Sequence, residues 1–108
     1  MDPQTYHFVV ASQAFLESEP LDEVLEERVR YYHEHNRPID FFYVTQPAFL
    51  NAPEWQSLAA KTGSPAAAVI STDAQFIRWL IIRLTFVETG SFVAPSPTIP
   101  DPLASLVA

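Results

Sequence analysis

The sequence contains no cysteine and only two glycines among its 108 residues. Without cysteine there is no disulfide, no thiolate nucleophile and no cysteine-ligated metal or iron–sulfur site. The two glycines, Gly63 and Gly90, are too few for a phosphate-binding loop or a dinucleotide fingerprint. A Gly-x-Ser-x-Gly nucleophile elbow is absent as well. These absences favour a binding or assembly role, and we predict that the chain is not an enzyme.

Basic residues are also scarce. Six lysines and arginines stand against thirteen acids, which gives a formal charge of −7. A nucleic-acid-binding protein needs a basic patch to displace counterions, so nucleic acid is not an expected partner. No apolar run reaches the roughly eighteen residues of a membrane span, and the N-terminal segment has no basic leader. We therefore expect an intracellular protein with no direct membrane insertion.

The histidines do not form a recognisable metal site. His33 and His35 are two residues apart on a predicted helix, so their side chains diverge. His7 lies on a predicted strand and has no evident partner. The Glu-x-x-His element of carboxylate-bridged di-iron bundles is also missing. We therefore predict no metal and no other cofactor.

Hydrophobic residues make up 48% of the chain, and its length fits one domain, residues 1–108. Period and turn signals predict strands at residues 6–11, 39–45, 66–71 and 91–94. They predict helices at about residues 20–35, 53–62 and 74–89, with residues 12–19 as a connection. Ser71, Thr72 and Asp73 offer an N-cap for the helix at 74–89. From about residue 95 a proline-rich tail is expected to be extended on the surface or disordered. A sheet covered by helices follows from this order, but the direction of its strands stays open.

Two arginines break the apolar pattern of their helices. Arg83 projects between Phe76 and Trp79, inside the apolar arc of its helix. Three interpretations of Arg83 are open. Its guanidinium reaches water while its stem lies along the aromatic rings, it pairs with a carboxylate of the domain, or this helix face is exposed and docks a partner. Arg28 interrupts the apolar arc of the earlier helix in the same way. For Arg28 we favour an ion pair within the domain or hydrogen bonds to a chain end.

Asp40 is the unusual residue of the strand predicted at 39–45, because aspartate is depleted from strands and costly to bury alone. Three interpretations are open: it is the exposed first residue of the strand, it pairs with Arg83 or Arg28, or it contacts another protein. Phe41 beside it is more typical of a core residue than of a contact residue.

Several segments together carry a resemblance to a known family. They are ASQAFL, EVLEER, IDFFYVTQPAFLNAPE, and PAAAVISTDAQFIRWLIIRLTFVETGSF with its proline-rich end. In this order, from about residue 6 to residue 103, the chain resembles the Ycf54 family of cyanobacteria and plastids. The runs at residues 39–54 and 65–90 are the specific ones.

The resemblance implies both a fold and a function. The fold is α+β, a mainly antiparallel sheet of about four strands flanked by helices. The function is that of a non-catalytic accessory or assembly factor for the oxygen-dependent cyclase of chlorophyll biosynthesis. That cyclase converts magnesium protoporphyrin IX monomethyl ester to protochlorophyllide, and its catalytic chain is a separate di-iron protein that the family member binds. The implied location is the cyanobacterial cytoplasm or the plastid stroma, beside the thylakoid only through the partner.

The family residues linked to cyclase binding match Asp40, Phe41, Arg83 and Ala11 in this sequence. Arg83 would donate bidentate hydrogen bonds to the partner, Asp40 would orient Arg83 or pair with a partner base, and Phe41 would supply apolar contact area. An alternative function is a tetrapyrrole-binding protein with Arg83 on a propionate. An enzyme in its own right is the weakest interpretation.

Overall fold

The fold is built on one antiparallel sheet. The computed structural model describes residues 3–18, 21–84 and 87–106. Its strands are β1 (Gln4–Ser12), β2 (Phe41–Thr45), β3 (Ala66–Ser71) and β4 (Glu88–Ala94), in the order β2-β3-β1-β4. All neighbouring pairs are antiparallel. The α+β fold with a four-stranded antiparallel sheet is therefore confirmed, and β3 has the predicted bounds.

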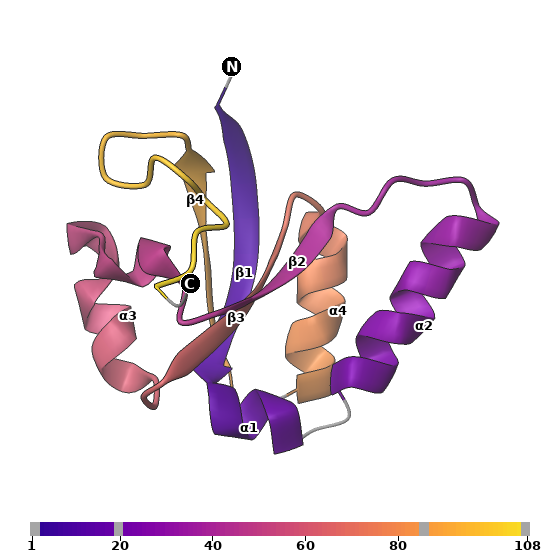
Figure 1. The fold of residues 1–108 in the computed structure, drawn as a ribbon, viewed down its shortest axis with the longest axis horizontal. Helices are drawn as coiled ribbons and strands as arrows, with labels where there is room; N and C mark the ends of the chain where they lie inside the picture. Colours follow the sequence, from indigo (N-terminus) through magenta and orange to yellow (C-terminus); the bar gives the residue numbers. More distant parts are fainter. Residues whose placement is uncertain (1–2, 19–20, 85–86, 107–108) are drawn as a thin grey trace.

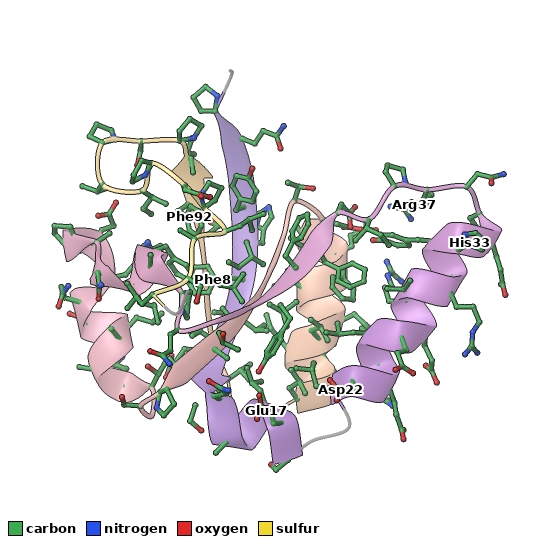
Figure 2. The ribbon with its side chains drawn as sticks, in the orientation of Figure 1. Phe8, Glu17, Asp22, His33, Arg37 and Phe92 are labelled. Carbon is green, nitrogen blue, oxygen red and sulfur yellow. The ribbon has the colours of Figure 1, made fainter. Side chains whose placement is uncertain are left out.

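Helices cover both faces of the sheet. One face carries α1 (Gln13–Ser18), α2 (Leu21–Glu34) and α4 (Ala74–Leu84), and α2 stands beside α4 (Figure 1). The opposite side carries the 3-10 turns η1 (Ala48–Asn51) and η2 (Pro53–Trp55), then α3 (Gln56–Lys61). Figure 2 shows Phe8 and Phe92 on the α3 side, whereas His33 and Arg37 lie at the far end of α2. The central strands therefore have two apolar faces to fill.

The core consequently falls into two clusters that share the strands. We name the first the α2-side core; its buried members include Val9, Leu16, Val24, Tyr32, Phe41, Val69, Phe76 and Leu80. We name the second the α3-side core; its buried members include Phe8, Val10, Phe49, Leu50, Ile70, Phe92 and Ile99. Successive residues of β1 and β3 alternate between the two clusters, as the period of two requires.

Two predicted boundaries were wrong. Residues 13–18 are a helix, α1, and not part of a connection; Ser12 Oγ accepts a hydrogen bond of 3.1 Å from the Phe15 N–H and caps it. The described part of α4 is Ala74–Leu84, and the fourth strand already begins at Glu88, so the helix does not extend to Gly90. Gly90 is a strand residue whose added Cβ would lie 2.9 Å from Phe8 and from Trp55. It permits close ring packing and does not stop a helix.

Other boundaries moved by one to three residues. β1 begins at Gln4 and β2 only at Phe41. The helix predicted at 53–62 divides into η2 and α3, and it ends at Lys61, before Gly63. Pro20, in the helix predicted at 20–35, lies outside the described residues. Thr85 and Phe86, in the helix predicted at 74–89, also lie outside them.

The proline-rich segment is irregular, as predicted, but residues 95–106 are held against the α3-side core. Ile99 is fully buried there, and Ser96 Oγ accepts a 3.0 Å hydrogen bond from its N–H. The Ala48 N–H donates to the Ala104 carbonyl over 2.8 Å, and the Leu106 N–H donates to the Gln46 carbonyl over the same distance. This segment therefore seals one face of the sheet.

Candidate docking surface

Asp73 fixes the beginning of α4. Its Oδ1 accepts hydrogen bonds from the backbone N–H groups of Gln75 (2.9 Å) and Phe76 (3.3 Å). This is the N-cap predicted for the segment Ser71–Asp73. The second carboxylate oxygen, Oδ2, lies 3.9 Å from Arg28 and 3.9 Å from Arg37. One aspartate thus ties α4 to α2 and to the loop that follows α2.

Asp40 lies immediately before β2 and is partly buried. Its Oδ1 accepts a 2.8 Å hydrogen bond from the Tyr32 hydroxyl, and its Oδ2 lies 3.8 Å from Arg37. Its backbone carbonyl accepts a hydrogen bond of 3.3 Å from the Thr72 N–H. The pairing proposed with Arg83 or Arg28 was therefore wrong, because the side-chain partners of Asp40 within the described residues are Tyr32 and Arg37.

Tyr32 is fully buried beneath this network. Burial raises the pKa of its phenol above the ordinary value, and the hydrogen bond to Asp40 raises it further. The Arg37 guanidinium lies 4.5 Å from the centre of its ring, a distance typical of cation–π contact. Tyr32 therefore stays a neutral donor that holds Asp40 in place.

Arg28 lies within the domain and has an ion pair, as predicted. Its side chain is 27% exposed, and the nearest carboxylate is that of Asp73 at 3.9 Å. The guanidinium carbon is 5.0 Å from the ring centres of Tyr32 and Phe76 and 5.2 Å from that of Tyr31. Its Nε is buried and has no acceptor among the described residues. A buried donor left unpaired costs about 1–3 kcal/mol.

Arg83 is exposed on α4, together with apolar neighbours. Its guanidinium carbon lies 5.9 Å from the Trp79 ring centre, and within the described chain it has no ion pair. Trp79 is 42% exposed and Ile82 is 78% exposed. Of the interpretations open for Arg83, the structure supports an exposed face with the guanidinium near the Trp79 ring.

A shallow groove separates α2 from α4. It encloses about 230 Å³ and is lined by Val24, Glu27, Arg28, Tyr31 and Trp79. Tyr31 is 43% exposed and, like Trp79, presents an apolar ring to solvent. We name the set Arg28, Tyr31, Trp79, Ile82 and Arg83 the docking face. Tyr31 and Ile82 were missed from the sequence because their exposure depends on how α2 rests beside α4.

The other two predicted site residues are buried. Phe41 is only 5% exposed and packs in the α2-side core, with its ring 4.9 Å from that of Phe76. Ala11 is buried in β1 and lines a separate hollow of about 270 Å³ with Lys61 and Glu88. Phe41 thus supports the docking face from beneath, through Phe76, and offers little contact area of its own.

The four predicted residues separate into two pairs. Phe41 is in register with Ser71, but Ala11 is in register with Ala67, four residues further along β3 and so about 13 Å away. Asp40 lies at the first turn of α4, and Arg83 comes nine residues after Ala74, about 14 Å along the helix. Asp40 and Phe41 therefore lie at one end of α4, and Arg83 lies at the end near Ala11.

No group of three His, Cys, Asp or Glu side chains that could hold a metal occurs in the described residues. Within that same part of the chain, no helix has the length and apolar character needed to cross a bilayer. The docking face itself presents aromatic rings, guanidinium donors and the exposed Ile82 side chain.

Comparison with known proteins identifies the family. The Ycf54 protein family profile matches residues 4–94. A Ycf54-like protein of Synechocystis sp. is 55% identical over 103 residues, which is 94% of this chain and 77% of that protein. The chloroplastic YCF54 protein of Arabidopsis thaliana is 37% identical over 93 residues, 84% of this chain and 43% of that protein. The X-ray structure of the All0216 protein from Nostoc sp. superposes with a TM-score of 0.94 at 59% identity, covering 98% of this chain and 99% of that chain. The chain therefore belongs to the Ycf54 family.

Proposed function

We propose that this protein is a non-catalytic accessory factor of the magnesium protoporphyrin IX monomethyl ester oxidative cyclase. In this proposal it binds the di-iron catalytic subunit and is needed for protochlorophyllide formation in chlorophyll biosynthesis. Membership of a family with cyanobacterial and chloroplastic members supports the proposal. The site of action would be the cyanobacterial cytoplasm or the plastid stroma, at the thylakoid through the partner.

The observation that carries the proposal is the exposed combination of Trp79, Ile82 and Arg83 on α4. Tryptophan and arginine are enriched among the residues that dominate protein–protein binding energy. Arg83 has no ion pair within the described residues, so its donors are available to a partner. An apolar helix surface with an available guanidinium fits a protein partner better than it fits solvent.

Pigment binding fits this surface less well. The groove encloses about 230 Å³, whereas small-molecule sites are usually clefts of about 300–1,000 Å³ that enclose most of the ligand. Spectral titration with magnesium protoporphyrin IX monomethyl ester should accordingly give no saturable shift. A saturable shift at low micromolar pigment would instead support the tetrapyrrole-binding alternative.

The proposal is tested by co-purification from a phototroph with the tagged chain. Wild type and Arg78→Ala should both recover the di-iron subunit, whereas Arg83→Ala should lose it. Arg78 is the matched control because it is exposed on the same helix, about 140° around the axis from Arg83. Removing one partner of a desolvated charged pair costs about 2–5 kcal/mol of binding.

Circular dichroism should show that all three proteins are folded. Recovery of equal amounts of di-iron subunit by Arg83→Ala and Arg78→Ala would remove Arg83 from the interface. Failure of the folded wild type to recover the subunit would overturn the proposed function.

A further inference from the structure

Arg28 lines the groove between α2 and α4 while one of its donors lacks an acceptor. The Nε atom is buried, and no hydrogen-bond acceptor for it occurs in the described part of the chain. Buried polar groups are normally paired, so an unpaired donor in the wall of an exposed groove needs an explanation. The side chain as a whole is 27% exposed, so an acceptor on another molecule can approach the exposed part of this incompletely paired guanidinium.

The charges around Arg28 leave room for such an acceptor. Asp73 is 3.9 Å away, beyond hydrogen-bond distance, and it is shared with Arg37. The other carboxylate oxygen of Asp73 accepts the hydrogen bonds that cap α4. The remaining carboxylate on this groove is Glu27, which is exposed at its rim. The guanidinium of Arg28 is therefore incompletely neutralised by its own chain.

A second guanidinium lies further along the same aromatic surface. Arg28 lies over the Phe76 ring, that ring stacks with Trp79 at 6.1 Å, and Arg83 lies near the Trp79 ring. Two arginines thus flank an aromatic pair on a protein whose formal charge is −7. Complementary charge on the occupant would be negative.

We propose that Arg28 is a second partner-binding residue and that the partner segment seated here is acidic and apolar. A carboxylate of the partner accepts hydrogen bonds from the exposed part of the Arg28 guanidinium in the groove, and apolar side chains beside it rest on Tyr31 and Trp79. The planar guanidinium is suited to bidentate recognition of a carboxylate. This inference rests on the proposed function, because the partner is the di-iron subunit.

The first test compares Arg28→Met with Asp73→Asn in binding titrations with the purified di-iron subunit. Methionine keeps an apolar stem but has no donor, so we expect affinity to fall about tenfold or more. Asparagine caps a helix as well as aspartate does. It also removes the Asp73 carboxylate, which competes with the partner carboxylate for Arg28, so the affinity for the di-iron subunit should be unchanged or higher. If Arg28 acts only by holding α2 to α4, Asp73→Asn will weaken binding as Arg28→Met does, and the inference is wrong.

The second test locates the partner carboxylate directly. A carbodiimide joins a lysine amine and a carboxylate as an amide, with loss of water. In the Asp73→Asn background, Arg28→Lys should give a cross-link at position 28 to an Asp or Glu of the di-iron subunit, found by mass spectrometry. The matched control is Arg30→Lys, two residues along α2 and therefore on the other side of the helix. Equal cross-linking at both positions, or none at position 28 in an intact complex, overturns the inference.

Failure of this inference is distinguishable from failure of the proposed function. If wild type binds the di-iron subunit, Arg83→Ala does not, and Arg28→Met binds like wild type, only the role of Arg28 fails. If folded wild type does not bind that subunit, the proposed function fails and this inference falls with it.

Discussion

The two faces of the sheet are built from similar apolar residues but differ in what covers those residues. On the α3 side, the rings of Phe8, Phe49 and Phe92 lie 4.7–6.0 Å apart, and residues 95–106 cover them. On the α2 side, the outer layer includes arginine–aspartate pairs and exposed rings. Apart from Phe42 at its β2 edge, which is 40% exposed, the first face is covered by its own chain, whereas the second leaves Trp79 and Tyr31 open to solvent.

The difference separates stability from recognition. Apolar packing closed on itself contributes free energy of folding and leaves little to offer a partner. A partly exposed aromatic surface contributes less to the free energy of folding, and its exposed apolar area can be buried when a partner binds. We therefore expect substitutions on the α3 side to change mainly folding and those on the docking face to change mainly binding.

Phe8→Ala gives the largest expected effect. Phe8 is completely buried, and its ring is 4.7 Å from Phe49 and 5.1 Å from Trp55. Truncating a buried phenylalanine costs about 3–5 kcal/mol, out of the roughly 5–15 kcal/mol by which domains are stable. Urea unfolding should show this loss, and binding should fall only with the folded fraction.

Trp79→Ala is the comparison for the open face. Although tryptophan is the larger ring, its exposure means that the stability loss should be less than half of that for Phe8→Ala. Binding of the di-iron subunit should decrease in the folded variant. A Trp79→Ala variant as unstable as Phe8→Ala would break the distinction between the faces.

Alkaline pH should destabilise the α2 side through Tyr43. Burial, and then the nearby Glu17 carboxylate, raises the pKa of Tyr43 from 10.0 to about 12. The folded protein therefore holds this proton longer than the unfolded chain does. The stabilisation is complete below pH 10 and is lost as the pH rises from about 10 through about 12. Urea midpoints over that range should fall less steeply for Tyr43→Phe, and identical slopes would contradict the assignment.

Ile82→Ser should give the smallest effect on folding. Ile82 is 78% exposed on α4, so the free energy of unfolding should change by no more than about 0.5 kcal/mol. Binding should weaken measurably because an apolar contact is lost. The matched control is Val93→Ser, which removes an exposed apolar side chain from β4. Equal binding losses from the two variants would mean that α4 is not the specific surface.

Much of the architecture could be predicted from local pattern. The run at residues 66–71 predicted β3 to the residue, and Asp73 was expected in the cap of α4. The position of Arg83 within an apolar arc left an exposed helix face as one of three interpretations, and Trp79 and Ile82 on that helix are exposed. In each case the signal lies within one element, where side-chain period and capping chemistry operate.

What the pattern missed depends on contacts between distant residues. The helix predicted to run to residue 89 is replaced from Glu88 onward by β4, because residues 88–94 pair with β1. Arg37 carries no signal of its own in the sequence, yet it meets Asp73 because the start of β2 lies beside the end of β3. Ile99 is buried despite its proline-rich surroundings because the α3-side core has space for it. Tertiary packing decided the outcome at all three places.

The pairing of β1 with β4 also has a consequence for how the chain folds. β1 is an inner strand, yet one of its neighbours is the last strand, with Gln4 in register with Ala94. Closing so long a loop before its contacts form slows folding. On the ribosome, the β1 edge stays unpaired until residues 88–94 emerge, and an unpaired strand edge invites pairing with other chains. A protein with this topology is therefore most exposed to aggregation during its own synthesis, before the sheet is complete.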